Sequence, residues 1–186
     1  ASPVAEYFLH CFLFAHRQFD QLAISTDLLW RKCGVLQLGS AMKGRHKISD
    51  ADLDALYSPA VIAPMSRADA AIAAGMALVD SAWYLPNGGW VNPLSLCRAY
   101  VSHPNIHLRC STPITSLRRG RDTWSALGAD GIPVAGETSV VVIANSYRAG
   151  QFQQTATIPL QGIRGQVTEI AGNKHSEALK LVVSGE

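Results

Sequence analysis

The run of apolar, mostly β-branched residues from Val140 to Ala144 is the feature that most constrains how this chain of 186 residues can fold. A strand with one wet face alternates apolar and polar residues, whereas a continuous apolar run is typical of a strand covered on both faces of a parallel sheet. The run leads into Asn145 and Ser146, and ligands of open α/β sheets bind beyond the carboxyl ends of such strands. The pattern therefore predicts either a nucleotide or flavin site at residues 144–146 or a core strand leaving in a polar turn.

Three other segments predict helices from periodicity and capping. Apolar residues recur at every third or fourth position over 3–22, which predicts an amphipathic helix with a wide buried stripe. Residues 66–74 are rich in alanine, a strong helix former. A third helix is expected from Pro93 to Val101, because Asn92 is a good N-cap and proline is favoured in the first turn. A short helix is also expected after the capping-box pattern at residues 49–52.

The remaining regular segments predict strands, most of them short and antiparallel. They are expected at 34–39, 77–85, 106–110, 114–118, 123–127 and 163–170, besides the buried strand at 139–144. Short antiparallel elements mixed with one strand of the parallel type predict the α+β class.

The composition predicts a surface that is partly covered by something else. Charged residues make up 16% of the chain, against about 25% in typical soluble domains. We therefore expect exposed apolar patches beside residues 140–144, or a second copy of the chain over them. The net charge of +2 does not by itself indicate a nucleic acid or an anionic membrane. No apolar stretch approaches the ~18 residues of a membrane span, and without a secretory signal a cytoplasmic location is expected.

Several specific kinds of site find no support in the sequence. The four cysteines form no Cys-x-x-Cys pair, so free thiols are expected. His103 and His107 are four residues apart, but Pro104 between them breaks the helix that would converge them, so no metal site is predicted. The chain has no G-x-G-x-x-G, Walker or G-x-S-x-G motif. The densest basic cluster, Arg118, Arg119 and Arg121, predicts either a solvated hairpin turn or contacts with RNA phosphates.

Several segments, taken together, resemble one known family in their order and spacing. They are residues 33–39, 84–93, 140–145, 151–155 and 159–167, including the Gly-Gly-Trp turn at 88–90 and the Arg-Gly-Gln strand at 164–166. This combination resembles the FAD-dependent oxidoreductase domain of the bifunctional tRNA 5-methylaminomethyl-2-thiouridine biosynthesis proteins, within the D-amino-acid oxidase and glycine oxidase group. The resemblance covers nearly the whole chain, to about residue 170.

This resemblance implies a mixed, mostly antiparallel substrate-domain sheet interleaved with part of an FAD-binding α/β domain. Residues 1–23 would form a helix of the FAD domain and residues 24–85 the first part of the substrate domain. Residues 86–157 would return to the FAD domain as a helix, a meander and the buried strand. Residues 158–186 would form a second part of the substrate domain.

The cofactor implied by the resemblance is FAD. Ile114 would meet its adenine, Ala144, Asn145 and Ser146 would lie near its phosphates, and Gly165 and Gln166 would belong to the cofactor site. The family's nucleotide fingerprint would precede the first helix. We therefore expect the isolated 186 residues to bind little or no FAD and to be inactive.

The implied reaction removes the carboxymethyl group from carboxymethylaminomethyl-(2-thio)uridine at the tRNA wobble position and releases glyoxylate. Arg164 is a candidate group near the flavin or substrate, because a guanidinium can clamp a carboxylate with two parallel donors. The implied partners are tRNA and a methyltransferase domain in the same polypeptide, and self-association is also expected. Two alternatives stay open: a small-molecule amine or amino-acid oxidase of the same group, and a non-catalytic binding module.

Overall fold

The computed structural model describes residues 3–39, 56–169, 171–174 and 176–185. The chain divides into two compact units: unit 1 comprises residues 1–106 and 170–186, and unit 2 comprises residues 107–169. Helices and mixed sheets together confirm the α+β class. The division into residues 1–23, 24–85, 86–157 and 158–186 stays a prediction, and the capping box at 49–52 lies outside the described residues.

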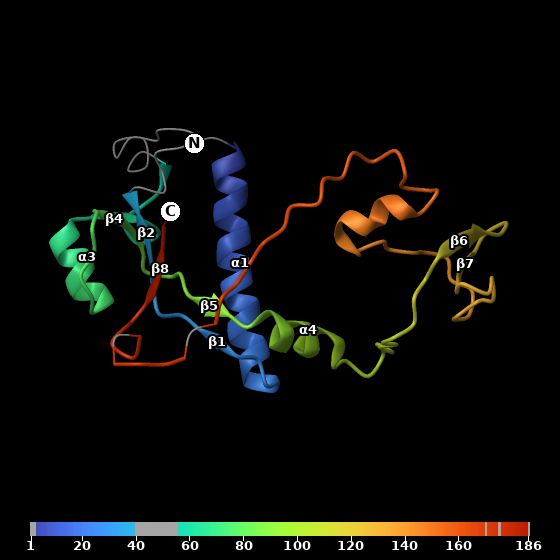
Figure 1. Cartoon of the computed structure of the whole chain (residues 1–186), viewed down its shortest axis with the longest axis horizontal. Helices are drawn as coiled ribbons and strands as arrows, with labels where there is room; N and C mark the ends of the chain where they lie inside the picture. The colour runs from blue at the N-terminus through green and yellow to red at the C-terminus, as the bar shows by residue number, and fades with distance from the viewer. Residues whose placement is uncertain (1–2, 40–55, 170, 175, 186) are drawn as a thin grey trace. The chain divides into compact units, whose positions relative to one another are not determined.

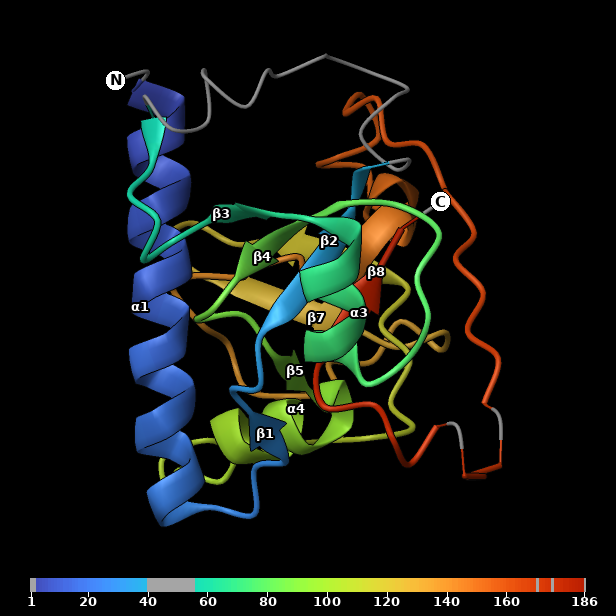
Figure 2. The same ribbon diagram turned by 90° about the vertical axis from the view of Figure 1, so that its left-hand side faces the viewer.

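A four-stranded mixed sheet forms the centre of unit 1 (Figure 2). Its strands, in spatial order, are β3 (Ala63–Met65), β4 (Ala82–Leu85), β2 (Val35–Leu38) and β8 (Val182–Ser184). Leu36 of β2 lies opposite Tyr84 in the antiparallel pair with β4 and opposite Val183 in the parallel pair with β8. The strand predicted at 34–39 is confirmed, whereas the short β8 was not predicted.

The helix α3 (Arg67–Ala74) packs on this sheet and completes the core of unit 1. Leu36, with no exposed surface, packs in one cluster with Ala70, Ala74 and Ala82, whose short side chains allow a close approach of helix and sheet. Ser66 caps the helix, since its Oγ accepts a 3.2 Å hydrogen bond from the backbone N of Asp69. The prediction of a helix over 66–74 is confirmed.

The first helix, α1 (Pro3–Ser25), is confirmed, but its predicted buried stripe is wrong. No residue of α1 is buried, and Val4 and Phe8 are 62% and 63% exposed. Leu9 and Phe12 are half-buried and line a cavity with Val61 and Ile62. Further along the helix, Phe19 contacts Trp30 of the short strand β1 (Trp30–Arg31), which pairs with β5 (Trp90–Val91). The apolar stripe is therefore half covered, and its N-terminal end stays exposed.

The helix α4 (Pro93–Val101) is confirmed with the predicted cap. Asn92 Oδ1 accepts a 2.9 Å hydrogen bond from Ser95 N, and Pro93 occupies the first turn. The strand predicted at 77–85 is confirmed only from Ala82 onward. Val79 before it is 85% exposed, although the Ser81 carbonyl accepts a 2.9 Å hydrogen bond from Gly39 N and Leu78 packs against the core.

Unit 2 is organised by a β-hairpin and a short 3-10 helix (Figure 1). Strands β6 (Ser116–Arg119) and β7 (Trp124–Leu127) pair antiparallel, and η2 (Ser146–Gln151) follows. These strands confirm the predictions at 114–118 and 123–127. The strand predicted at 106–110 is wrong, because Leu108 is 64% exposed and finds no partner strand among the described residues.

The buried strand predicted at 139–144 is also wrong. The segment has no regular structure, and Val140 and Val142 are 68% and 81% exposed. Thr138 forms an isolated bridge with Trp124, and its hydroxyl then donates a 3.1 Å hydrogen bond to the carbonyl of Val140. A local side-chain bond of this kind competes with a strand ladder, so pairing ends at Thr138.

The strand predicted at 163–170 is wrong over its described part, residues 163–169. Ile163 and Val167, the residues meant for its buried face, are 86% and 90% exposed. An alternating pattern forms a strand only where one face can be buried and a neighbouring edge can be paired, and this segment has neither.

Candidate cofactor site

A mostly apolar cavity of about 290 Å³ lies in unit 2, beside the hairpin. The hairpin contributes Leu117 and Ala126, which face each other across the two strands. Phe152, only 8% exposed, comes from the residue that follows η2. The hairpin is anchored there, because Gln154 Nε2 donates a 2.9 Å hydrogen bond to the carbonyl of Leu117.

The cavity brings together three of the residues that the resemblance assigned to the cofactor. Ile114, Ala144 and Asn145 all line it, although Ile114 precedes the other two by a whole hairpin. Ser146 follows as the first residue of η2, with φ at 58°, a left-handed conformation that is uncommon for a residue other than glycine. The structure thus places Ile114 beside the end of the 140–144 run.

The other predicted residues lie elsewhere in unit 2. Arg164, Gly165 and Gln166 are all exposed in an irregular segment, and none of them lines this cavity. A Cβ built on Gly165 would meet nothing within 4 Å. The structure therefore gives Gly165 no close neighbour that would require a glycine.

The cavity fits one ring of a dinucleotide cofactor, not the whole molecule. Its wall is largely apolar, and Asn145 is the polar side chain that lines it, which suits the flat face of a base. Its volume of about 290 Å³ lies just below the ~300–1,000 Å³ range for pockets that enclose drug-sized ligands. No basic side chain lines it to meet a pyrophosphate. These residues fit the adenine end of FAD and leave its phosphates without a cradle.

A second cavity, of about 260 Å³, borders the same apolar segment. It is lined by Trp124, Val140 and Val141, among others. The exposed Val140 and Val142 therefore have hollow apolar surface next to them. Exposed apolar surface beside residues 140–144 is what the low charge of the chain predicted, although the segment is not a strand.

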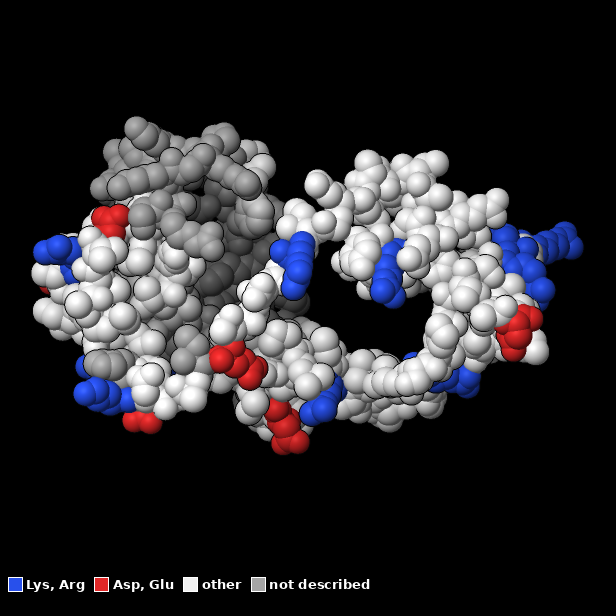
Figure 3. Space-filling model, in the orientation of Figure 1, with Lys and Arg blue, Asp and Glu red and all other residues white. Residues whose placement is uncertain are grey.

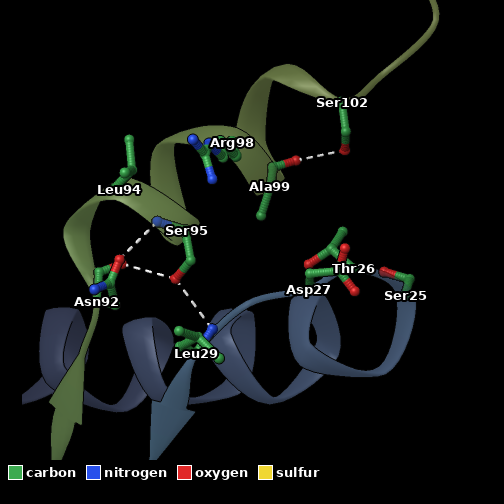
Figure 4. Close-up of a pocket in the computed structure, with 10 residues that line it drawn as sticks. All are labelled: Ser25, Thr26, Asp27, Leu29, Asn92, Leu94, Ser95, Arg98, Ala99 and Ser102. Atoms are coloured by element: carbon green, nitrogen blue, oxygen red, sulfur yellow. Dashed lines mark hydrogen bonds between the residues drawn. The ribbon is translucent and has the colours of Figure 1, made fainter.

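A larger cleft, of about 680 Å³, lies in unit 1 between the end of α1 and α4 (Figure 4). Ser95 organises its wall: its Oγ donates to the carbonyl of Asn92 at 2.9 Å and accepts from Leu29 N at 3.0 Å. Asp27 and Arg98 supply opposite charges to the lining. The cleft is open and its lining is more apolar than polar. Sequence analysis missed it because Leu29 and Ser95, which meet there, lie 66 positions apart.

His16 on α1 is a titratable group that the sequence did not single out. Its ring contacts Phe12 at 4.4 Å and Trp30 at 5.2 Å between centroids, and its buried Nδ1 has no hydrogen-bond partner within the described part of the chain. Burial lowers the pKa of His16, the charge of Lys32 lowers it further, and Asp20 opposes the shift. His16 therefore favours its neutral form and serves as a packing group.

The described residues hold few other chemical sites. No group of three or more His, Cys, Asp or Glu side chains could hold a metal ion within them. The four cysteines, Cys11, Cys33, Cys97 and Cys110, are free thiols. No helix in the described part of the chain is both long and apolar enough to cross a membrane.

The chain is similar to known proteins along nearly all of its length. A model of the family "FAD dependent oxidoreductase" matches residues 3–184. The "tRNA 5-methylaminomethyl-2-thiouridine biosynthesis bifunctional protein MnmC" of Pseudomonas putida (strain KT2440) is 33% identical over 185 residues, which are 100% of this chain and 27% of that protein. The protein of the same name from Stutzerimonas stutzeri (strain A1501) is 34% identical over 172 residues, 92% of this chain and 25% of that protein.

Among solved structures, glycine oxidase from Geobacillus kaustophilus has a similar fold. Its TM-score is 0.59 at 17% sequence identity, over 87% of this chain and 44% of that chain. At this identity the likeness shows the fold alone. The chain spans about a quarter of the length of the curated relatives.

Proposed function

The chain belongs to the family of FAD-dependent oxidoreductases, and from this premise we propose that it is part of an enzyme that modifies the wobble uridine of tRNA. The proposed reaction removes the carboxymethyl group of carboxymethylaminomethyl-(2-thio)uridine and releases glyoxylate. The observation that carries the proposal is the identity of 33% along the whole chain with a protein named for tRNA 5-methylaminomethyl-2-thiouridine biosynthesis.

The overall reaction balances without a nucleophile from this chain. The carbon between the amine nitrogen and the carboxylate is oxidised, and water then supplies the oxygen of the glyoxylate carbonyl. The aminomethyl group left on the base goes to a methyltransferase domain in the same polypeptide. FAD, when bound, supplies the hydride acceptor that amine oxidation needs.

This chain's own residues would hold the adenine end of the cofactor. Leu117, Ala126 and Phe152 exclude water from the flat faces of the ring, and Ile114 lies beside it. Asn145 offers the amide donors and acceptor of its side chain to the polar groups next to the ring. We keep Ser146, Gly165 and Gln166 as proposed cofactor contacts from the resemblance.

Arg164 is the proposed clamp for the substrate carboxylate. It is exposed, so its five N–H donors are accessible to a carboxylate. A bidentate pair of this kind fixes both the distance and the orientation of the carboxylate. Such positioning is the main contribution a protein makes when the cofactor performs the chemistry.

The proposal is tested with the full-length polypeptide that carries this chain. Incubation with hypomodified tRNA should release glyoxylate in proportion to the aminomethyl groups formed, and the purified protein should show flavin absorbance. Turnover of free glycine or sarcosine without glyoxylate release from tRNA would instead identify a small-molecule amine oxidase. A colourless protein that is indifferent to FAD would identify a binding module.

A filled cavity tests the adenine site separately. Ala126→Phe places a ring in the space beside Leu117 and should weaken FAD binding at least tenfold, while Ala129→Phe adds the same ring at an exposed loop outside the cavity. FAD titration by fluorescence quenching measures both variants. If wild type and Ala126→Phe bind FAD with equal affinity, the cavity is not part of the cofactor site. The glyoxylate assay would still test the proposed reaction independently.

A further inference from the structure

The turn of the β6–β7 hairpin carries three arginines within four positions, Arg118, Arg119 and Arg121, which we call the arginine turn. All three are exposed. Gly120 N donates a 2.8 Å hydrogen bond to the carbonyl of Thr123, which closes the turn between the two strands. The backbone therefore places three cations at one end of the hairpin, with Arg118 and Arg119 on opposite faces of β6.

One of these arginines is held by a ring. The Arg119 guanidinium lies 4.7 Å from the centroid of Trp124, its partner across the strands. A guanidinium stacked on an indole keeps the N–H groups at its edge available to an anion. The stack also limits the rotamers of the Arg119 side chain, so this side chain loses less rotamer entropy when an anion binds.

The charges of the arginine turn are not neutralised within unit 2. No arginine of the turn forms an ion pair among the described residues 107–169. Glu137, the acid bonded to the hairpin, accepts a 2.8 Å hydrogen bond from the Thr123 hydroxyl instead. The turn, which also carries the carboxylate of Asp122, therefore presents a net positive charge to its surroundings.

All the Lys and Arg side chains of unit 2 are arginines. Residues 107–169 contain six arginines and no lysine against four acids, and half of these arginines lie in the arginine turn. Figure 3 shows the blue side chains gathered over β6 and β7. Arginine donates two parallel hydrogen bonds to a phosphate, whereas lysine acts as a point charge.

We propose that the arginine turn binds phosphates of the RNA strand that carries the substrate base. This inference rests on the proposed function, since an enzyme that acts on one base of a tRNA must also hold the strand around it. The residues at the tip, Gly120, Arg121 and Asp122, include no apolar side chain to insert into a membrane. Phosphate contacts of this kind give affinity and position without base specificity.

The test measures how salt weakens RNA binding by the full-length polypeptide. Each neutralised phosphate adds about 0.7 to the slope of log affinity against log salt for a single strand, so the arginine turn accounts for about 2. Replacing Arg118, Arg119 and Arg121 by glutamine should therefore reduce the loss of affinity between about 50 and about 200 mM salt by about 16-fold. The probe is a fluorescein-labelled anticodon stem–loop, followed by anisotropy.

Two matched variants keep the result interpretable. Replacing Arg67, Lys174 and Lys180 by glutamine removes the same charge from exposed positions of unit 1 and should leave RNA affinity within twofold of wild type. Replacing the arginine turn by three lysines keeps the charge and should retain most of the slope. Circular dichroism should show the same melting temperature for every variant.

The proposal is overturned if the glutamine variant of the arginine turn keeps the wild-type slope, or if the unit 1 control loses as much affinity. It is also overturned if the wild-type polypeptide does not bind the stem–loop. Flavin absorbance and the release of glyoxylate from tRNA, measured on the same wild-type preparation, report the proposed function independently. If RNA binding proves independent of the arginine turn, the proposed function still stands. If the protein shows no flavin absorbance or releases no glyoxylate, the proposed function itself is refuted.

Discussion

Truncation of Leu36 to alanine should destabilise unit 1 by about 3 kcal/mol. Leu36 is the large side chain that the described core buries completely, at 0% exposure. Leucine-to-alanine changes in cores cost about 2–5 kcal/mol, depending on how well the neighbours fill the hole. Ala70 and Ala74 cannot extend into it, but the partly buried Met65 is flexible enough to fill some of it. We therefore expect a loss of about 3 kcal/mol in the free energy of unfolding, which changes the folding equilibrium about 150-fold.

Equilibrium unfolding in urea, followed by tryptophan fluorescence, measures this loss, because Trp83 is 7% exposed on the strand next to Leu36. The control is Ile72→Ala on the outer face of α3, where the isoleucine is 74% exposed. A surface change of this kind should stay within about 0.5 kcal/mol of wild type. The packing of α3 on the sheet is refuted if Leu36→Ala unfolds within about 1 kcal/mol of wild type, or if both variants lose equally.

Three further changes test separate features of unit 1 and unit 2. Gly89→Ala should lower the melting temperature, because its Cβ would come 2.1 Å from the carbonyl oxygen of Arg31. The control Gly165→Ala, whose Cβ would meet nothing within 4 Å, should melt at the wild-type temperature. Equal melting temperatures for the two variants would contradict this prediction. His16→Phe should reduce the loss of stability on acidification: burial lowers the pKa of His16, so below about pH 6.5 the unfolded chain binds a proton first and wild-type stability falls until the folded pKa is passed. Urea midpoints at about pH 7.5 and 5.5 measure this, and an unchanged difference between them would refute it. Ser66→Ala should cost about 1 kcal/mol in urea unfolding by removing the N-cap of α3, whereas a loss below about 0.2 kcal/mol would deny the cap a role.

The sequence predicted best those elements whose stabilising contacts are local. The cap of α4 bonds to a backbone group three residues away, so Asn92 identified that helix, whereas α3 was predicted from the alanine content of residues 66–74. The β6–β7 hairpin is closed by the short turn at 120–123, and the turn residues likewise predicted it from the sequence. The family was also recognisable, because turns and strand ends at fixed spacing carry it.

The long-range features followed a different rule. The strand β8, near the C-terminal end of the chain, pairs in parallel with β2, and the three residues of β8 do not by themselves predict this pairing. The apolar run 140–144 looked like a buried strand, but a strand exists only where a neighbouring edge takes its hydrogen bonds. The structure instead ends pairing at Thr138 and leaves Val142 exposed.

By itself, the sequence determined the α+β class, the two capped helices, the hairpin and the family of FAD-dependent oxidoreductases. The tertiary structure decided that Ile114, Ala144 and Asn145, which the resemblance assigned to one cofactor, line a single cavity, and that the charges of the arginine turn form no ion pair among the described residues. The physical reason is the range of the interactions. Capping and turn formation depend on neighbours in sequence, whereas cavities, sheet edges and uncompensated charges depend on which distant segments come to lie beside them.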